Sequence, residues 1–341
     1  MVVIRKSVLI KTDGSNEIGM GHIILSITLA KKFKEKGYKI FFLTPKNKIL
    51  QNKLSKFGIW KWFKTKNDEK EIIKKIKPDI IILNISKKFF SPSVTYIKNL
   101  KKICKLLITF ENTGKIIQYV DLSFNSLIFH NYHKIKKNFQ GIEFCPIRKE
   151  FLESRKTYKI RKKVKSIILL QGGADTRNVS LKLIKFLEKM NYLFKITVII
   201  GPMSQNYREL EKFAKLSSKK ITLLYDVKKM HSEIKKHDIA ITAGGTTLIE
   251  SLTIGIPSII ACGEMHEMAL AKNIHIKKAA KNLGYGPQIK QKLFIKTIEL
   301  LCDNFEIRKN LNTKAKHNVD GKGLNRIFQL IEKEMKKEVR N

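Results

Sequence analysis

The stretch that decides the fold reads Asp13-Gly14-Ser15-Asn16-Glu17-Ile18-Gly19-Met20-Gly21-His22. Residues 7–11 before it form a β-branched run typical of a buried strand, and the apolar residues after it recur at helical spacing. A strand, a glycine-containing turn and a helix make the first half of a βαβ unit. In open α/β sheets that turn lies at the carboxyl ends of the strands, where ligands bind.

The end of this turn is a candidate reactive site. The glycines let the backbone come close to a ligand, and the start of the helix offers unpaired N–H groups to an anion. The positive end of the helix disfavours imidazolium, so we expect His22 to stay neutral and to accept a proton. The alternative is that Gly19 and Gly21 only shape a turn and His22 is a surface histidine, because one glycine-rich turn is a weak motif.

A second glycine-rich turn, Ala243-Gly244-Gly245-Thr246-Thr247, also follows an apolar strand and opens a helix. Its glycines leave room for a close ligand, and the threonine hydroxyls add donors to the exposed N–H groups, which suits a diphosphate. Glu250 lies on the same helix face and can accept both hydroxyls of a ribose. The alternative is a packing turn followed by a solvated Glu250. Two such turns, one in each half, predict a ligand held in a cleft between two domains.

Strands and helices alternate through both halves of the chain, which predicts an α/β protein with two Rossmann-like domains whose parallel sheets face each other across a cleft. We expect an N-terminal domain over 1–155, a C-terminal domain over 164–320 that begins after a charged stretch, and a C-terminal helix over 321–341 that packs back towards the first domain. The strands expected are 7–11, 38–44, 80–83, 106–110, 121–125, 166–170, 196–200, 221–225, 239–242 and 258–261.

The chain of 341 residues is strongly basic: Lys and Arg number 69 and Asp and Glu 29, for a formal charge of +40. Because of this charge, nucleic acid, an anionic membrane and an anionic substrate are candidate partners. The basic residues are spread along the whole chain without a separate polybasic arm, and the joint abundance of Lys, Ile and Asn fits a compositional bias of the source genome. We therefore expect a phosphate-bearing small molecule as the substrate and no nucleic-acid partner.

The four cysteines are far apart and show no zinc-ligand spacing, so we expect no obligatory metal, no cofactor, and reduced thiols in a cytoplasmic protein. The N-terminus lacks the architecture of a signal peptide. The longest apolar tract, residues 239–262, contains glycines, a glutamate and a proline, so it predicts strands and a helix and no membrane span.

Residues 13–22 resemble the N-terminal signature of the UDP-sugar hydrolases of pseudaminic acid biosynthesis (PseG) and the related spore-coat polysaccharide proteins (SpsG). That family is similar to the MurG glycosyltransferases and has the GT-B fold. The likeness continues through 146–151, 172–178, 243–257 and 319–323, nearly the whole chain. It implies hydrolysis of a UDP-linked 2,4-diacetamido-trideoxyhexose to UDP and free sugar. It also implies that His22 assists the attacking water and that the second domain holds UDP.

Some positions depart from the family pattern, mainly on the sugar side. Leu25 stands where an arginine is usual, Asn84-Ile85-Ser86 replaces Asp-x-Tyr, Glu111-Asn112 replaces Asp-Asp, and Glu264-Met265-His266 replaces Glu-Asn-Gln. The UDP-side motif is kept. With His22 as the catalytic residue, the predicted substrate-binding residues are Asp13, Gly19, Gly21, Gly172, Gly173, Asn178, Gly244, Gly245, Thr246, Thr247, Glu250, Glu264 and His266.

The leading hypothesis is hydrolysis of a UDP-activated amino sugar for nonulosonic acid or surface-polysaccharide biosynthesis. His22 would take a proton from water, and the turn at Gly244 would hold the charge of the UDP leaving group. A GT-B glycosyltransferase with the same donor site is the alternative enzyme. A non-catalytic nucleotide-sugar-binding protein is the alternative from another class. The identity of the sugar and the oligomeric state stay open.

Overall fold

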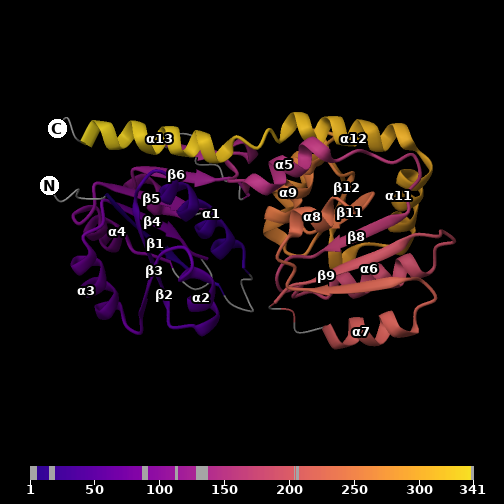
Figure 1. The fold of residues 1–341 in the computed structure, drawn as a ribbon, viewed down its shortest axis with the longest axis horizontal. Coiled ribbons are helices and arrows are strands. Elements are labelled where there is room, and N and C mark those ends of the chain that lie inside the picture. The colour runs from indigo at the N-terminus through magenta and orange to yellow at the C-terminus, as the bar shows by residue number, and fades with distance from the viewer. Residues whose placement is uncertain are drawn as a thin grey trace. The chain divides into compact units, whose positions relative to one another are not determined.

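The computed structural model of the chain describes residues 6–14, 20–86, 91–111, 114–127, 137–202, 204 and 207–338, and the statements below concern these residues. The chain divides into two compact units (Figure 1). The first unit comprises Met1–Pro146 and Lys322–Asn341, and the second comprises Ile147–Gly321.

The first unit contains a seven-stranded sheet in the order β3-β2-β1-β4-β5-β6-β7, in which all neighbouring strands are parallel. Its strands are β1 (Ser7–Thr12), β2 (Lys39–Pro45), β3 (Ile59–Phe63), β4 (Ile80–Asn84), β5 (Leu106–Phe110), β6 (Leu122–Asn125) and β7 (Asn138–Gln140). Its helices are α1 (Gly21–Glu35), α2 (Lys48–Leu54), α3 (Lys66–Ile76), α4 (Val94–Lys101), α13 (Gly323–Glu338) and the short 3₁₀ helices η1 (Lys115–Tyr119) and η2 (Ile142–Phe144).

Burial explains the central strands of this sheet. Every residue of β4 and of β5 is buried, as expected for parallel strands covered by helices on both faces. On one face Leu9, Ile81 and Leu107 pack with Ile73 of α3 and Ile97 of α4. Strand alternation therefore sends one set of apolar side chains to each face, and the carboxyl ends of the strands are left for the loops.

The C-terminal helix α13 belongs to the first unit. The ring of Phe328 packs on the ring of Phe33 in α1, with 4.6 Å between the ring centres. Two ion pairs also tie α13 to this unit, Lys36–Glu332 at 2.7 Å and Lys137–Glu334 at 2.6 Å. Residues 322–338 thus return to the first unit after the second has been completed.

The second unit contains a six-stranded parallel sheet in the order β10-β9-β8-β11-β12-β13. Its strands are β8 (Ser166–Leu170), β9 (Lys195–Ile200), β10 (Ile221–Tyr225), β11 (Ile239–Thr242), β12 (Ser258–Cys262) and β13 (Lys281–Tyr285). Its helices are α5 (Lys149–Thr157), α6 (Val179–Glu188), α7 (Tyr207–Leu216), α8 (Met230–Ile234), α9 (Thr246–Ile254), α10 (Met268–Ile276), α11 (Gln291–Asp303), α12 (Phe305–Asn318), η3 (Met265–Glu267) and η4 (Gly286–Gln288).

Both sheets reverse their strand order beside the first strand, between β1 and β4 and between β8 and β11. Such a reversal opens a crevice at the carboxyl ends of the two strands, where α/β proteins bind ligands. The prediction of two Rossmann-like α/β domains with parallel sheets is confirmed. In the part of the chain that the structure describes, no helix combines the length and the apolar character needed to cross a membrane.

Two details differ from the sequence analysis. Strands β3, β7 and β13 differ from the expectation, because β7 has only 3 residues and the apolar residues of β3 and β13 are interrupted by polar ones or glycine. The second unit also begins at Ile147, earlier than the charged stretch suggested. The reason is α5: Arg155 donates hydrogen bonds to the carbonyl oxygens of Lys316 and Val319, so this helix is part of the second unit.

Candidate functional site

In the first unit, His22 pairs with a buried asparagine. His22 lies in the first turn of α1, and its Nδ1 is 2.7 Å from Oδ1 of Asn84, the last residue of β4. Asn84 is completely buried, and its Nδ2 donates to the carbonyl oxygen of His22 at 2.8 Å and to Oγ of Ser26 at 2.9 Å. Strands β1 and β4 are neighbours, and this pairing brings Asn84 beside the start of α1.

These contacts fix the tautomer of the histidine. The carbonyl oxygen of His22 can only accept, so the amide nitrogen of Asn84 must face it and Oδ1 must face the imidazole. Oδ1 also can only accept, so Nδ1 of His22 carries the proton and donates it to Asn84. In the neutral ring Nε2 then holds the free lone pair. His22 is therefore oriented to accept a proton at Nε2. Asn84, expected only as a departure from the family pattern, thus orients the imidazole, and the sequence carried no signal for this contact.

Asp13, predicted to bind substrate, is buried and joins the two strands at the point of reversal. Both of its carboxylate oxygens lie 3.1 Å from the backbone N–H of Ser86, which donates to them. Burial raises the pKa of Asp13, while the neighbouring His22 and the hydrogen bond from Ser86 act in the opposite direction. Asp13 thus connects the loop after β1 to the loop after β4.

Among the other predicted positions of the first unit, Gly21 is exposed, whereas Glu111 is already hydrogen-bonded within the protein. A Cβ built on Gly21 meets none of the described residues within 4 Å, which leave the start of α1 open there. Gly19 lies outside the described residues. Glu111, which replaces an aspartate of the family pattern, is buried and accepts hydrogen bonds from the backbone and the hydroxyl of Ser126. It holds the chain after β6.

In the second unit, the turn from Gly244 to Thr247 joins β11 to α9. A Cβ on Gly244 would lie only 2.6 Å from Cβ of Glu267, so the glycine is required by close packing. Gly245 is the N-cap of α9, and the first turn of this helix has neither a side-chain cap nor an acidic residue among the described residues. The half-buried Thr246 and Thr247 add hydroxyl donors to this helix start. The free backbone N–H groups suit an anion, while the carboxylate of Glu267 lies beside the N-cap Gly245.

The loop from Gly172 to Asn178 follows β8, the strand next to β11. Gly172 is exposed with φ +78°, and Gly173 packs its carbonyl against the turn after β9. The carboxylate of Asp175 accepts the first two backbone N–H groups of α6 at 2.9 and 3.0 Å. This helix start is therefore occupied by the protein itself. Asn178 has φ +54° and donates from Nδ2 to Glu209 at 3.2 Å.

Two buried polar side chains at the same edge of the sheet lack partners among the described residues. Both amide atoms of Gln171, 6% exposed, and the hydroxyl of the fully buried Thr242 form no hydrogen bond there. Gln171 directly follows β8, and Thr242 is the last residue of β11. Leaving such groups unpaired costs free energy, so a polar ligand at this edge would stabilise them. The sequence did offer a signal that Gln171 belongs to a site, since it is a polar residue between an apolar strand and two glycines.

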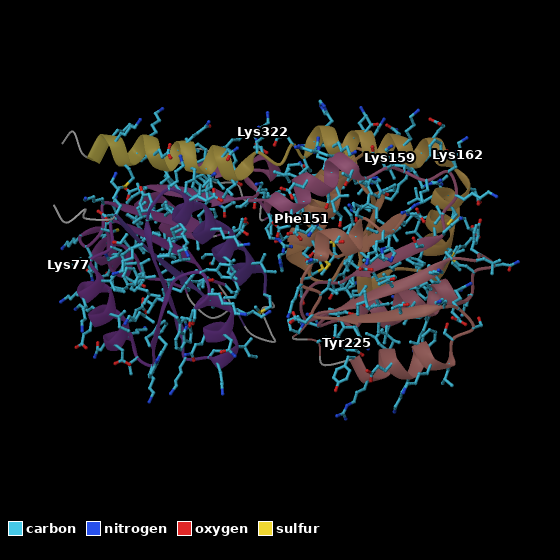
Figure 2. The ribbon with its side chains drawn as sticks, viewed as in Figure 1. Lys77, Phe151, Lys159, Lys162, Tyr225 and Lys322 are labelled. Atoms are coloured by element: carbon cyan, nitrogen blue, oxygen red, sulfur yellow. The ribbon has the colours of Figure 1, made fainter. Side chains whose placement is uncertain are left out.

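Glu250, the predicted ribose acceptor, is 4% exposed and paired with an arginine. Its Oε1 accepts from Nε of Arg148 at 2.9 Å and from Nη2 at 2.7 Å. Burial raises the pKa of Glu250, and Arg148 partly offsets this. The guanidinium of Arg148 also lies over the ring of Phe151, 4.6 Å from its centre; Figure 2 labels Phe151 on α5. Glu250 thus joins α9 to α5, and a ribose would have to use Oε2.

The loop after β12 completes this edge. Glu264 accepts from Oγ1 of Thr176 at 2.7 Å, so it is in contact with the loop that follows β8. Glu267 accepts from the backbone N–H of Gly263 at 2.8 Å and packs against the glycine turn before α9. His266 is exposed. The structure therefore brings three loops together at the carboxyl ends of β8, β11 and β12. In the described residues no group of three or more His, Cys, Asp or Glu side chains could hold a metal ion.

No family model matches the chain. An uncharacterised protein of Methanocaldococcus jannaschii is 30% identical over 266 residues, which is 73% of this chain; the chain spans about half (54%) of the length of that relative. The spore coat polysaccharide biosynthesis protein SpsG of Bacillus subtilis is 22% identical over 94% of this chain and 96% of its own length. A Clostridium tetani N-acetylglucosamine transferase, which acts on a pyrophosphoryl-undecaprenol substrate, is 24% identical over 92% of this chain and 95% of its own length.

Solved structures show the same fold. MurG of Acinetobacter baumannii superposes with a TM-score of 0.69 at 14% identity, covering 96% of this chain and 99% of MurG. The UDP-GlcNAc 2-epimerase of Neisseria meningitidis, solved with UDP-GlcNAc bound, superposes with a TM-score of 0.61 at 13% identity over 96% of this chain and all (100%) of the epimerase. The chain therefore has the GT-B fold of the MurG-like glycosyltransferases, with two Rossmann-like domains that each contain a parallel sheet.

Proposed function

We propose that this protein hydrolyses a UDP-activated amino sugar and releases UDP and the free sugar, with His22 as the general base. The observation that carries the proposal is the pair formed by His22 and Asn84, because it holds a proton on Nδ1 and leaves Nε2 as the nitrogen that can accept one. The resemblance of residues 13–22 to the UDP-sugar hydrolases supports the reaction type. The relation to SpsG supports a role in polysaccharide biosynthesis.

The proposed reaction needs one proton transfer and one substitution at carbon. The oxygen of water attacks the anomeric carbon while Nε2 of His22 takes a proton from that water. The bond between the anomeric carbon and the diphosphate oxygen breaks, and its electron pair leaves with UDP. The proton held on His22 then passes to solvent, so the base is restored. Asp13 and Asn84 act by holding the backbone and the imidazole in place.

The second unit would hold the leaving group. Diphosphate oxygens would accept hydrogen bonds from the uncapped start of α9 and from the hydroxyls of Thr246 and Thr247. Gln171, buried and unpartnered among the described residues, would gain a partner from the same ligand. Glu250 would accept a ribose hydroxyl at Oε2 while Arg148 holds its Oε1. This division assigns nucleotide affinity to one unit and proton transfer to the other.

The experiment is incubation with a panel of UDP-linked and other nucleotide-linked amino sugars, with mass spectrometry of the nucleotide and sugar products. We expect UDP and free sugar without any added acceptor. His22→Gln should lower turnover by a factor of about 10²–10⁴ while UDP affinity in calorimetry stays the same. His317→Gln, which changes an exposed histidine on α12, is the matched control. Equal turnover of the wild type and His22→Gln would rule out His22 as the base.

Transfer of the sugar to an acceptor is the second candidate function. The relation to the Clostridium tetani protein, which is named as an N-acetylglucosamine transferase, favours it. The same donor site and the same histidine would serve, with an acceptor hydroxyl in place of water. Product formation only after an acceptor is added would support transfer over hydrolysis.

A further inference from the structure

One surface of the first unit takes no part in the proposed reaction. It is formed by the edge strand β3 and the helix α2 before it, and we refer to it as the β3 edge surface. In Figure 1 both elements are labelled in the first unit, next to β2. Along β3, Trp60 and Trp62 point to one face of the sheet and Ile59 and Lys61 to the other, and the open strand edge presents both sets. The surface comprises Ile49, Ile59, Trp60 and Trp62 with the exposed lysines Lys46, Lys48, Lys56, Lys61, Lys64 and Lys66.

The aromatic part of this surface is unusual for the chain. The protein has two tryptophans, and both lie in β3, which ends the sheet and pairs only with β2 among the described residues. Nε1 of Trp60 donates to Oγ1 of Thr44 at 3.0 Å, so this side chain is fixed in place. The ammonium group of Lys46 lies 4.7 Å from the ring centre of Trp62, and that of Lys64 lies 5.9 Å from it.

The same surface exposes large apolar side chains. Ile49 on α2 is 47% exposed, and Ile59 at the start of β3 is 41% exposed. An unpaired strand edge that carries apolar residues invites association, and proteins usually protect such edges with charge. Lys61 and its neighbours provide that charge here, but Ile49 and Ile59 stay exposed and Trp60 and Trp62 are half-buried. Apolar and aromatic groups among lysines match the interface of a membrane, where Trp anchors and Lys meets the headgroups.

The charge of the β3 edge surface is of one sign. Residues 36–67 contain nine lysines and no aspartate or glutamate. None of the six exposed lysines of the surface forms an ion pair with a carboxylate in the part of the chain that the structure describes. The carboxylate of Asp68 lies beside Lys64 and partly offsets its charge. The other five lysines keep the edge cationic and complementary to a surface of anionic headgroups.

We propose that the β3 edge surface docks the protein on an anionic lipid bilayer. Lysines would contact the phosphate groups while Ile49, Ile59 and the tryptophan rings enter the boundary between headgroups and acyl chains. A nucleic acid fits less well, because the exposed Ile49 and Ile59 gain nothing from a phosphate backbone. This docking is separate from the proposed hydrolysis and does not depend on it.

The test uses the full-length protein and vesicles made of equal parts phosphatidylcholine and phosphatidylserine, with pure phosphatidylcholine vesicles as the reference. Both tryptophans belong to the surface, so their emission reports on it directly. We expect sedimentation with the anionic vesicles, a blue shift of the emission, and quenching by lipids brominated on the acyl chain. The triple variant Lys46→Gln, Lys61→Gln and Lys64→Gln should bind about a hundredfold more weakly, at about fivefold per lysine.

A matched control removes the same charge elsewhere. Lys212, Lys215 and Lys220 are exposed in the second unit, and their triple change to Gln should leave the partition coefficient within about a factor of three of the wild type. Equal losses in both triple variants would show that total charge and not this surface binds lipid. Absence of binding to the anionic vesicles would overturn the proposal, and so would binding without a change in tryptophan emission. Tighter binding to RNA or DNA that depends on Lys46, Lys61 and Lys64 in the same way would also overturn it.

Discussion

Replacing Arg148 by Met should destabilise the second unit strongly, because it leaves the carboxylate of Glu250 without its partner. The two donors of Arg148 contact the same oxygen at 2.9 and 2.7 Å, and the side chain of Glu250 is only 6% exposed. Breaking a buried pair on one side typically costs about 3–5 kcal/mol. Arg148 itself is 20% exposed, so we expect the low end of that range, about 3 kcal/mol.

The loss should depend on pH. Burial already raises the pKa of Glu250 above its ordinary value of 4.5, and Arg148 is the main group that lowers it. Without Arg148 the pKa of the folded state rises further, so the folded state binds a proton that the unfolded chain has released. The stability that this proton gives is present below about pH 4.5 and is lost as the pH rises. The destabilisation is therefore greatest near neutral pH and smaller near pH 5.

The assay is urea unfolding followed by far-UV circular dichroism at both pH values. Tryptophan emission does not serve here, since both tryptophans lie in the first unit. Adding Glu250→Gln to Arg148→Met removes the buried charge and should recover most of the lost free energy of unfolding. A loss below about 1 kcal/mol near neutral pH, or no recovery in the double variant, would refute the argument that an unpaired buried carboxylate is the cause.

Asn84→Ala should lower kcat by a factor on the order of 10² with little change in KM, because the imidazole of His22 loses the hydrogen bond that orients it while the substrate contacts stay the same. Steady-state kinetics that show only a change in KM would contradict this role. Burial lowers the pKa of His237, whose Nε2 accepts from Thr197, so stability should be lost as the pH falls below about 6.5. Urea midpoints measured across that range should fall, and His237→Gln should flatten the dependence; equal slopes would exclude this histidine. Asp175→Ala removes the cap of α6 and should cost about 1–2 kcal/mol in urea unfolding, whereas Asp175→Asn should retain part of that; no loss in the Ala variant would contradict the capping role.

The sequence by itself determined the two-domain α/β fold. The runs at 7–11, 80–83, 166–170 and 239–242 are apolar or β-branched, and glycine-rich turns follow several of them. Such runs are typical of parallel strands that helices cover on both faces, so the pattern is local and can be recognised without the rest of the chain. The same patterns located both glycine-rich turns and the histidine at the start of α1.

Only the tertiary structure decided which polar groups meet. Asn84 is 62 residues from His22, and it reaches the imidazole because the strand order reverses and places β4 beside β1. Arg148 is 102 residues from Glu250, and the pairing depends on α5 packing against α9. Strand β3 likewise depends on the hydrogen bonds that β2 offers to a short segment. Periodicity tells which face of an element is buried, but the partner of a buried polar side chain is set by the strand order and helix packing of the folded chain.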